Sequence, residues 1–97
     1  MQMTITEVLQ KINLLEGYYS TSEALDIMNQ LIDVKINHHK LQILSRRIND
    51  ENARTDFHDN RIKELMEEKA KLKSYISLAK TEGKQVQLNS QVEISFI

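Results

Sequence analysis

The sequence contains no cysteine, no proline, no tryptophan and only two glycines. Without cysteine the chain forms no disulfide, no thiolate metal site and no cysteine nucleophile. No uninterrupted apolar run approaches the roughly 20 residues that a helix needs to cross a bilayer. The start MQMTITEVLQ has neither the basic nor the apolar part of a signal peptide. We therefore expect a cytoplasmic protein that does not span a membrane.

The chain also has no excess of one charge sign, because its 13 Lys and Arg residues are balanced by 14 Asp and Glu residues. Binding to a phosphate backbone usually requires a net positive field, so the balance disfavours nucleic acid as the main partner. Lysine outnumbers arginine, and isoleucine equals leucine in number. We expect this bias from an AT-rich genome, such as that of a low-GC bacterium or its phage.

Ninety-seven residues make one domain, over 1–97. A chain of this length buries only about 60–65% of the surface that its unfolded form exposes, so a monomer would be modestly stable. Association with further copies would bury more apolar surface. The size alone therefore favours a homo-oligomer.

Capping patterns and apolar residues at spacings of three and four predict two helices in the first half of the chain. The capping box Thr4-Ile5-Thr6-Glu7 begins the first helix, over about 4–16, and Gly17 would end it. Ser20-Thr21-Ser22-Glu23 begins the second helix, which runs without Gly or Pro to about residue 52. Its roughly 30 residues make about 45 Å, against a diameter of about 32–35 Å for a compact globule of this size. This second helix must therefore kink or project into a partner.

A third helix is predicted over about 59–81, with Asp59 as its cap and Gly83 just beyond its end. One side of it resembles a coiled-coil seam, although lysine occupies one position. The seam consists of Ile62, Leu65, Lys69, Leu72, Ile76 and Ala79.

From about residue 85 to residue 97, apolar and polar residues alternate, which is typical of a strand with one buried face. A two-residue turn at Asn89-Ser90 would mix apolar and polar side chains on one face, so one continuous strand or a three-residue turn is favoured. The predicted fold class is mainly α. It is a helical hairpin or bundle with one long central helix, a coiled-coil-like second long helix and a C-terminal β-strand or short hairpin.

The segment INHHKLQ places two imidazoles and an amide in the middle of the longest helix. At about 100° per residue, six polar side chains project within roughly 60° of one line between two apolar ridges. We call them the polar stripe: Lys35, His38, His39, Gln42, Arg46 and Asn49. A basic groove between helices suits an anionic ligand, because helix surfaces exclude water while cations offset its charge. The alternative is that the stripe forms the wet centre of a bundle or pairs with Glu64, Glu67 and Glu68.

Metal binding and catalysis are both disfavoured. His38 and His39 diverge by about 100°, whereas zinc on a helix requires ligands at i and i+4. A second group, Asp56, His58 and Asp59, precedes the third helix, where aspartate is more often a cap. His58 beside a carboxylate allows acid–base chemistry, but no nucleophile or glycine-rich loop accompanies it. We expect no metal, no cofactor and no enzyme.

RINDENART, over residues 47–55, together with the charged helix and alternating strand that follow it, resembles the septicolysin-like family of small bacterial helical proteins. The matching positions of the family's turn are Ile48, Asn49, Asn52, Ala53 and Thr55. The resemblance covers about half of the chain. The resemblance implies a helical assembly. The name of the family refers to pore formation, but the family has no assigned active site whose residues could be matched in this sequence.

Two hypotheses follow from these patterns. The first is a small self-assembling binding protein of a phage or bacterium that captures an anionic small molecule or a host protein in the polar stripe, as counter-defence sponges do. The second is a structural helical assembly without a small ligand, which the septicolysin resemblance favours.

Overall fold

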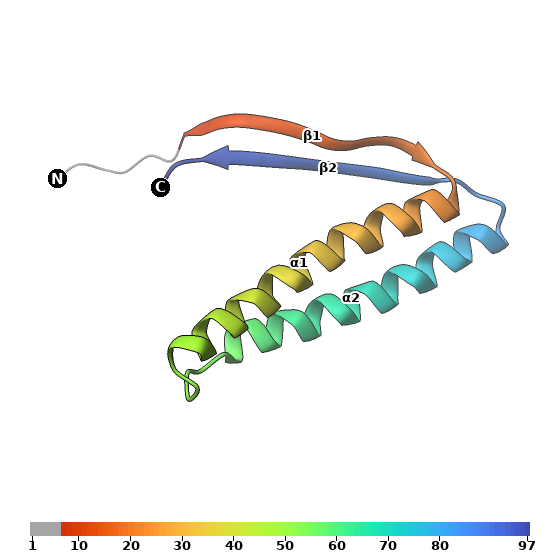
Figure 1. Ribbon diagram of the computed structural model, residues 1–97. Coiled ribbons are helices and arrows are strands. Elements are labelled where there is room, and N and C mark those ends of the chain that lie inside the picture. Colours follow the sequence, from red (N-terminus) through yellow and green to blue (C-terminus); the bar gives the residue numbers. More distant parts are fainter. Residues whose placement is uncertain (1–6) are drawn as a thin grey trace.

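The computed structural model describes residues 7–97 and contains two strands and two helices. In chain order these are β1 (Val8–Tyr19), α1 (Thr21–Asn49), α2 (Asp56–Thr81) and β2 (Val86–Ser95). The strands form a two-stranded antiparallel sheet, and the helices form an antiparallel hairpin with α1 between the sheet and α2 (Figure 1). Within residues 7–97, no helix is both long and apolar enough to cross a membrane.

The first predicted helix is wrong, and so is the predicted fold class. Residues Val8–Tyr19 form a strand rather than a helix over 4–16, and this strand pairs with β2 along the whole of its length. The chain is a mixture of helix and strand, not a helical bundle. Of the capping box that was expected to start this helix, Thr4, Ile5 and Thr6 lie outside the described residues.

The sheet is amphipathic, as its register shows. Every even-numbered residue of β2 shares one face with its partner on β1, and the pairs Ile12–Val92, Gly17–Leu88 and Tyr19–Val86 lie on this face. We call it the apolar sheet face: Ile12, Leu15, Tyr19, Val86, Leu88, Val92 and Ile94. The opposite face pairs Lys11 with Glu93 and Asn13 with Gln91. The C-terminal segment is therefore one continuous strand, and the alternation that predicted it is confirmed.

The helix ends follow local hydrogen-bonding rules. Ser20 Oγ accepts the backbone N–H of Glu23 at 3.1 Å, which caps α1 as the sequence predicted. The end of α2 satisfies its last carbonyls through Gly83, whose φ of +67° suits glycine. The loop is displaced from its predicted place, because α1 ends at Asn49 rather than near residue 52 and α2 begins at Asp56 rather than at 59.

The contact between α1 and α2 uses the predicted seam of α2. Its six residues are buried or half-buried, with Ile76 the most enclosed. Lys69 at the polar seam position donates to Asp33 Oδ1 of α1 at 2.7 Å, so the lysine joins the two helices. A cation in the seam is thus explained by a carboxylate on the facing helix.

The molecule is extended rather than globular. Its radius of gyration is 17.8 Å and its extents are 51 × 39 × 18 Å, whereas a compact chain of this length would have a radius near 12–13 Å. The sheet and the helical hairpin meet where β1 leads into α1 and where α2 leads into β2. They diverge toward the outer end of the sheet, where β1 begins and β2 ends (Figure 1). Leu15 and Leu88 are half-buried near the junction, whereas Val92 and Ile94, farther out, are each 39% exposed. The apolar sheet face is therefore turned toward α1 but loses its cover with distance from the junction.

Candidate functional site

The polar stripe does not converge on one site. His39 is buried between the helices and Gln42 is half-buried, whereas the other four members, Lys35, His38, Arg46 and Asn49, are exposed. Among residues 7–97, no ion pair joins a stripe residue to α2, so the predicted pairing with Glu64, Glu67 and Glu68 is not formed. One edge of the stripe enters the helix–helix contact and the other faces solvent. The ligand-binding role of these six residues stays a prediction.

His39 instead pairs with His58 of α2. Their Nδ1 atoms are 2.9 Å apart, His39 is 4% exposed and His58 is 8% exposed. One ring must donate and the other accept, so this bond requires at least one neutral imidazole. His39 Nε2 is buried and has no hydrogen-bond partner in the structure. The pair therefore fastens α1 to the start of α2 at the closed end of the hairpin.

The surroundings of His39 oppose its protonation. Burial lowers the pKa of His39 from its ordinary value of 6.5, because a charged imidazolium loses its hydration there. Neighbouring positive charges lower this pKa further, and they come from Lys35, His58, His38 and Arg61. The position of His39 therefore disfavours the charged form of its ring.

The loop between the helices is ordered by a short chain of hydrogen bonds. Arg47 Nη2 donates to Thr55 Oγ1 at 3.2 Å, and that hydroxyl donates to Asp59 Oδ2 at 2.7 Å. Thr55 is 5% exposed, and Asp50 accepts the backbone N–H of Asn52 at 3.0 Å. The predicted cap Asp59 lies inside α2 and accepts from the threonine instead. These contacts hold RINDENART as a structural turn.

At the closed end of the hairpin an aromatic ring packs against the two buried histidines. Within residues 7–97, no three His, Asp or Glu side chains gather where they could hold one metal ion. Phe57 packs its ring edge-on against His39 and His58, with ring centroids 6.2 Å and 5.2 Å apart. Both histidines are thus enclosed by an aromatic ring and by each other. The two histidines form a small polar cluster within the contact between α1 and α2.

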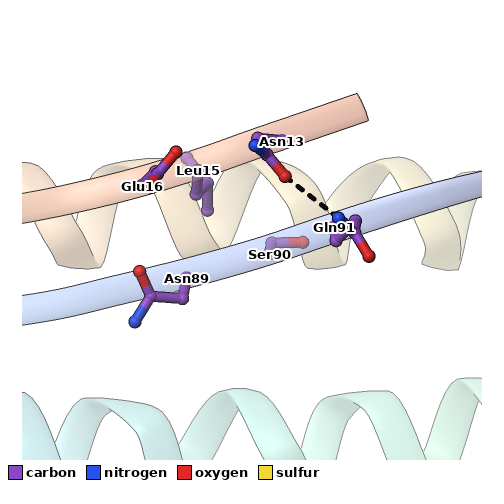
Figure 2. A pocket seen from close by; sticks show the side chains of 6 residues that line it. All are labelled: Asn13, Leu15, Glu16, Asn89, Ser90 and Gln91. Carbon is purple, nitrogen blue, oxygen red and sulfur yellow. Dashed lines mark hydrogen bonds between the residues drawn. The ribbon is translucent and has the colours of Figure 1, made fainter. Parts of the chain in front are cut away.

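A shallow hollow lies on the sheet, where β1 carries an extra residue opposite Ser90 (Figure 2). Six residues line it, and Gln91 Nε2 donates to Asn13 Oδ1 across the strands at 3.1 Å. The lining contains the carboxylate of Glu16 and no cation. This hollow therefore has the wrong charge for an anionic ligand.

The most extensive unusual feature of the surface is apolar. Large hydrophobic side chains that are at least 37% exposed occur on all four elements. On α1, the residues Ile27, Leu31, Val34, Leu41 and Ile48 fall within about 100° of arc. The first two are half-buried near the junction, whereas the other three are exposed. Together with the outer part of the apolar sheet face, this side of α1 is a candidate interaction surface.

No protein-family model, no curated protein and no solved structure matches this chain. The septicolysin-like resemblance therefore stays a prediction, and the site is interpreted from its geometry alone.

Sequence reasoning missed the partnership of His39 and His58, as well as the buried position of Thr55. Two signals were available. His58 lies one residue after Phe57 at the start of a helix, where an aromatic residue and an imidazole can close the end of a hairpin. RINDENART contains side chains suited to hydrogen bonds within a turn, but their partners depend on how the helices meet.

Proposed function

We propose that this protein is a non-catalytic assembly protein whose working form is a homo-oligomer. The observation that carries the proposal is the small amount of apolar surface that one chain encloses. Among residues 7–97, the buried hydrophobic residues are Ala24, Ile36 and Ile76, and no large side chain is fully enclosed. A chain that folds alone normally offsets its conformational entropy with a larger core.

The uncovered apolar area is what association would use. Burial of apolar surface yields roughly 25 cal/mol per Å², and contiguous exposed apolar patches on soluble proteins commonly mark interaction sites. Here the exposed residues lie on two adjoining surfaces, the outer apolar sheet face and one side of α1. Covering both surfaces would stabilise the extended fold.

The histidine pair supports a structural role over an enzymatic one. His58 was the sequence's candidate for acid–base chemistry, yet its Nδ1 is engaged by His39 and its side chain is 8% exposed. A general base must reach a substrate proton within hydrogen-bond distance. The geometry favours a structural role for His58, in which its hydrogen bond to His39 holds the two helices of the hairpin together.

Light scattering on the purified chain at micromolar concentration tests the proposal. We expect a mass that is a whole multiple of the 11.3 kDa chain, with two copies as the smallest assembly. A mass of one chain would overturn the proposal. Heat released on titration with nucleotides would instead favour the polar stripe as an anion-binding site.

A further inference from the structure

β2 has a sequence pattern that is symmetric about its own centre. Apolar residues lie two and four positions on either side of Ser90, as Leu88 and Val92, and as Val86 and Ile94. Polar residues fill the positions between them. A strand with this pattern can face a second copy of itself in antiparallel orientation with like residues opposed.

The outer edge of β2 is free to make such a pairing. The sheet has two strands, so within residues 7–97 each strand has one edge without a partner strand. β1 carries two irregularities, between Val8 and Gln10 and between Asn13 and Leu15, and both insert the extra residue on β1. Bulges interrupt the regular row of backbone groups and protect an edge from pairing. β2 has ten residues without an insertion, so its free edge is the one that can pair with a further strand.

We propose that β2 pairs along this edge with β2 of a second copy, antiparallel and centred on Ser90, to form a four-stranded sheet. This inference rests on the proposed function and names its interface. In this register Leu88 lies opposite Val92 of the partner subunit, and Val86 lies opposite Ile94 of the partner subunit. The four apolar residues of each strand then extend one continuous apolar face.

Charge and side-chain alternation both select this register. Glu93, the one charged residue of β2, lies opposite Gln87 of the partner subunit, so no like charges meet. A shift by one residue would place Leu88 opposite Glu93 and mix the two faces. A shift by two residues keeps the faces but leaves either Val86 or Ile94 without an apolar partner inside the strand.

The overall shape gives the pairing a further advantage. A two-fold axis perpendicular to the sheet keeps both helical hairpins on the apolar side. Antiparallel pairing also brings the outer end of one sheet, where Ile94 is poorly covered, beside the junction end of the other, where the helices approach (Figure 1). The helices of each copy would therefore lie near the part of the partner's apolar sheet face that its own helices leave uncovered.

Disulfide trapping tests the register directly, because the natural chain has no cysteine. In the Ser90→Cys variant, the two position-90 Cα atoms would be about 4.5–5.5 Å apart, which suits a disulfide. Mild oxidation should convert most of the protein to a species of twice the chain mass on a non-reducing denaturing gel. The matched control is Gln87→Cys, whose two copies would be six residues apart, about 20 Å. It should remain unlinked.

The outcomes separate this interface from the proposed function. If light scattering shows an oligomer while Ser90→Cys does not link, the edge pairing is overturned and self-assembly stands. Equal linking of Ser90→Cys and Gln87→Cys also overturns the register, because it would reflect random collision or another strand's edge. A single-chain mass together with no linking defeats both proposals.

Discussion

Two adjacent histidines in one helix have opposite roles here. His39 enters the contact between α1 and α2, whereas His38 is exposed, because successive helical residues diverge by about 100°. The buried Nε2 of His39 lacks a partner, and an unsatisfied buried polar atom costs free energy. The bond to His58 offsets part of that cost. The pair therefore stabilises the hairpin only while at least one of the two rings is neutral.

This leads to a prediction for the pH dependence of stability. The pKa of His39 is lowered in the folded state, so the unfolded chain binds more protons and stability rises with pH. The stabilisation is complete above about pH 6.5, the ordinary histidine value, and is lost as the pH falls below it. Urea midpoints at fixed chain concentration should be lower at about pH 5.5 than at about pH 8.

The matched pair of variants is His39→Gln and His38→Gln. The first should lose most of the pH dependence, whereas the second should keep most of it, since the exposed ring takes no part in the pair. An unchanged pH dependence in His39→Gln would place the responsible group elsewhere.

Among the elements, the C-terminus of α2 shows most clearly how a local motif fixes a boundary. Gly83 N–H donates to Lys80 O at 3.1 Å, and Lys84 N–H donates to Ala79 O at 2.9 Å. This two-bond pattern requires a left-handed residue at Gly83, where φ is +67°. It also directs the chain from the helix into β2.

We therefore predict that Gly83→Ala lowers the free energy of unfolding by about 1–2 kcal/mol, because a side chain is disfavoured in the left-handed region. Gly83→Asn should cost less, since asparagine tolerates that region better. Chemical denaturation at one chain concentration measures both. Equal stability of Gly83→Ala and the parent protein would contradict the role of the motif.

Of the two strands, β2 was predicted from the sequence, whereas β1 was mistaken for a helix. The register of β1 shows why. Ile12 and Leu15 are three residues apart, as on a helix, yet their partners Val92 and Ser90 are two apart, so both lie on the same sheet face. The inserted residue between Asn13 and Leu15 converts a period of two into a spacing of three. Sequence periodicity cannot reveal such a bulge, because it depends on the partner strand. β2 has no insertion, and its alternation was read correctly.

The helical hairpin was more predictable because its signals are local. Ser20 caps α1, Gly83 ends α2, and the seam of α2 follows helical spacing. The polar stripe was located on α1 from the same spacing, but the side that would meet α2 could not be derived. That side depends on how two helices rotate against each other, which places His39 inside and Lys35 outside.

At the scale of the whole molecule, shape and composition support the same conclusion. The sequence predicted that its longest helix would exceed a compact globule, and α1 with 29 residues belongs to a molecule 51 Å long. The structure does not compensate by folding the sheet tightly over the helices. Under the proposed self-assembly, contacts between copies would supply much of the stability of this fold.

The last prediction concerns thermal stability. If folding is coupled to association, mass action makes the melting temperature depend on chain concentration. Raising the concentration from about 1 µM to about 100 µM should raise the melting temperature by roughly 5–10 °C. Oxidised Ser90→Cys should lose this dependence, because its two chains no longer separate on unfolding, whereas the reduced variant should behave as the parent does. A melting temperature that is constant over this range in the parent protein would mean that the extended chain is stable alone, and that its exposed apolar surface serves a different partner.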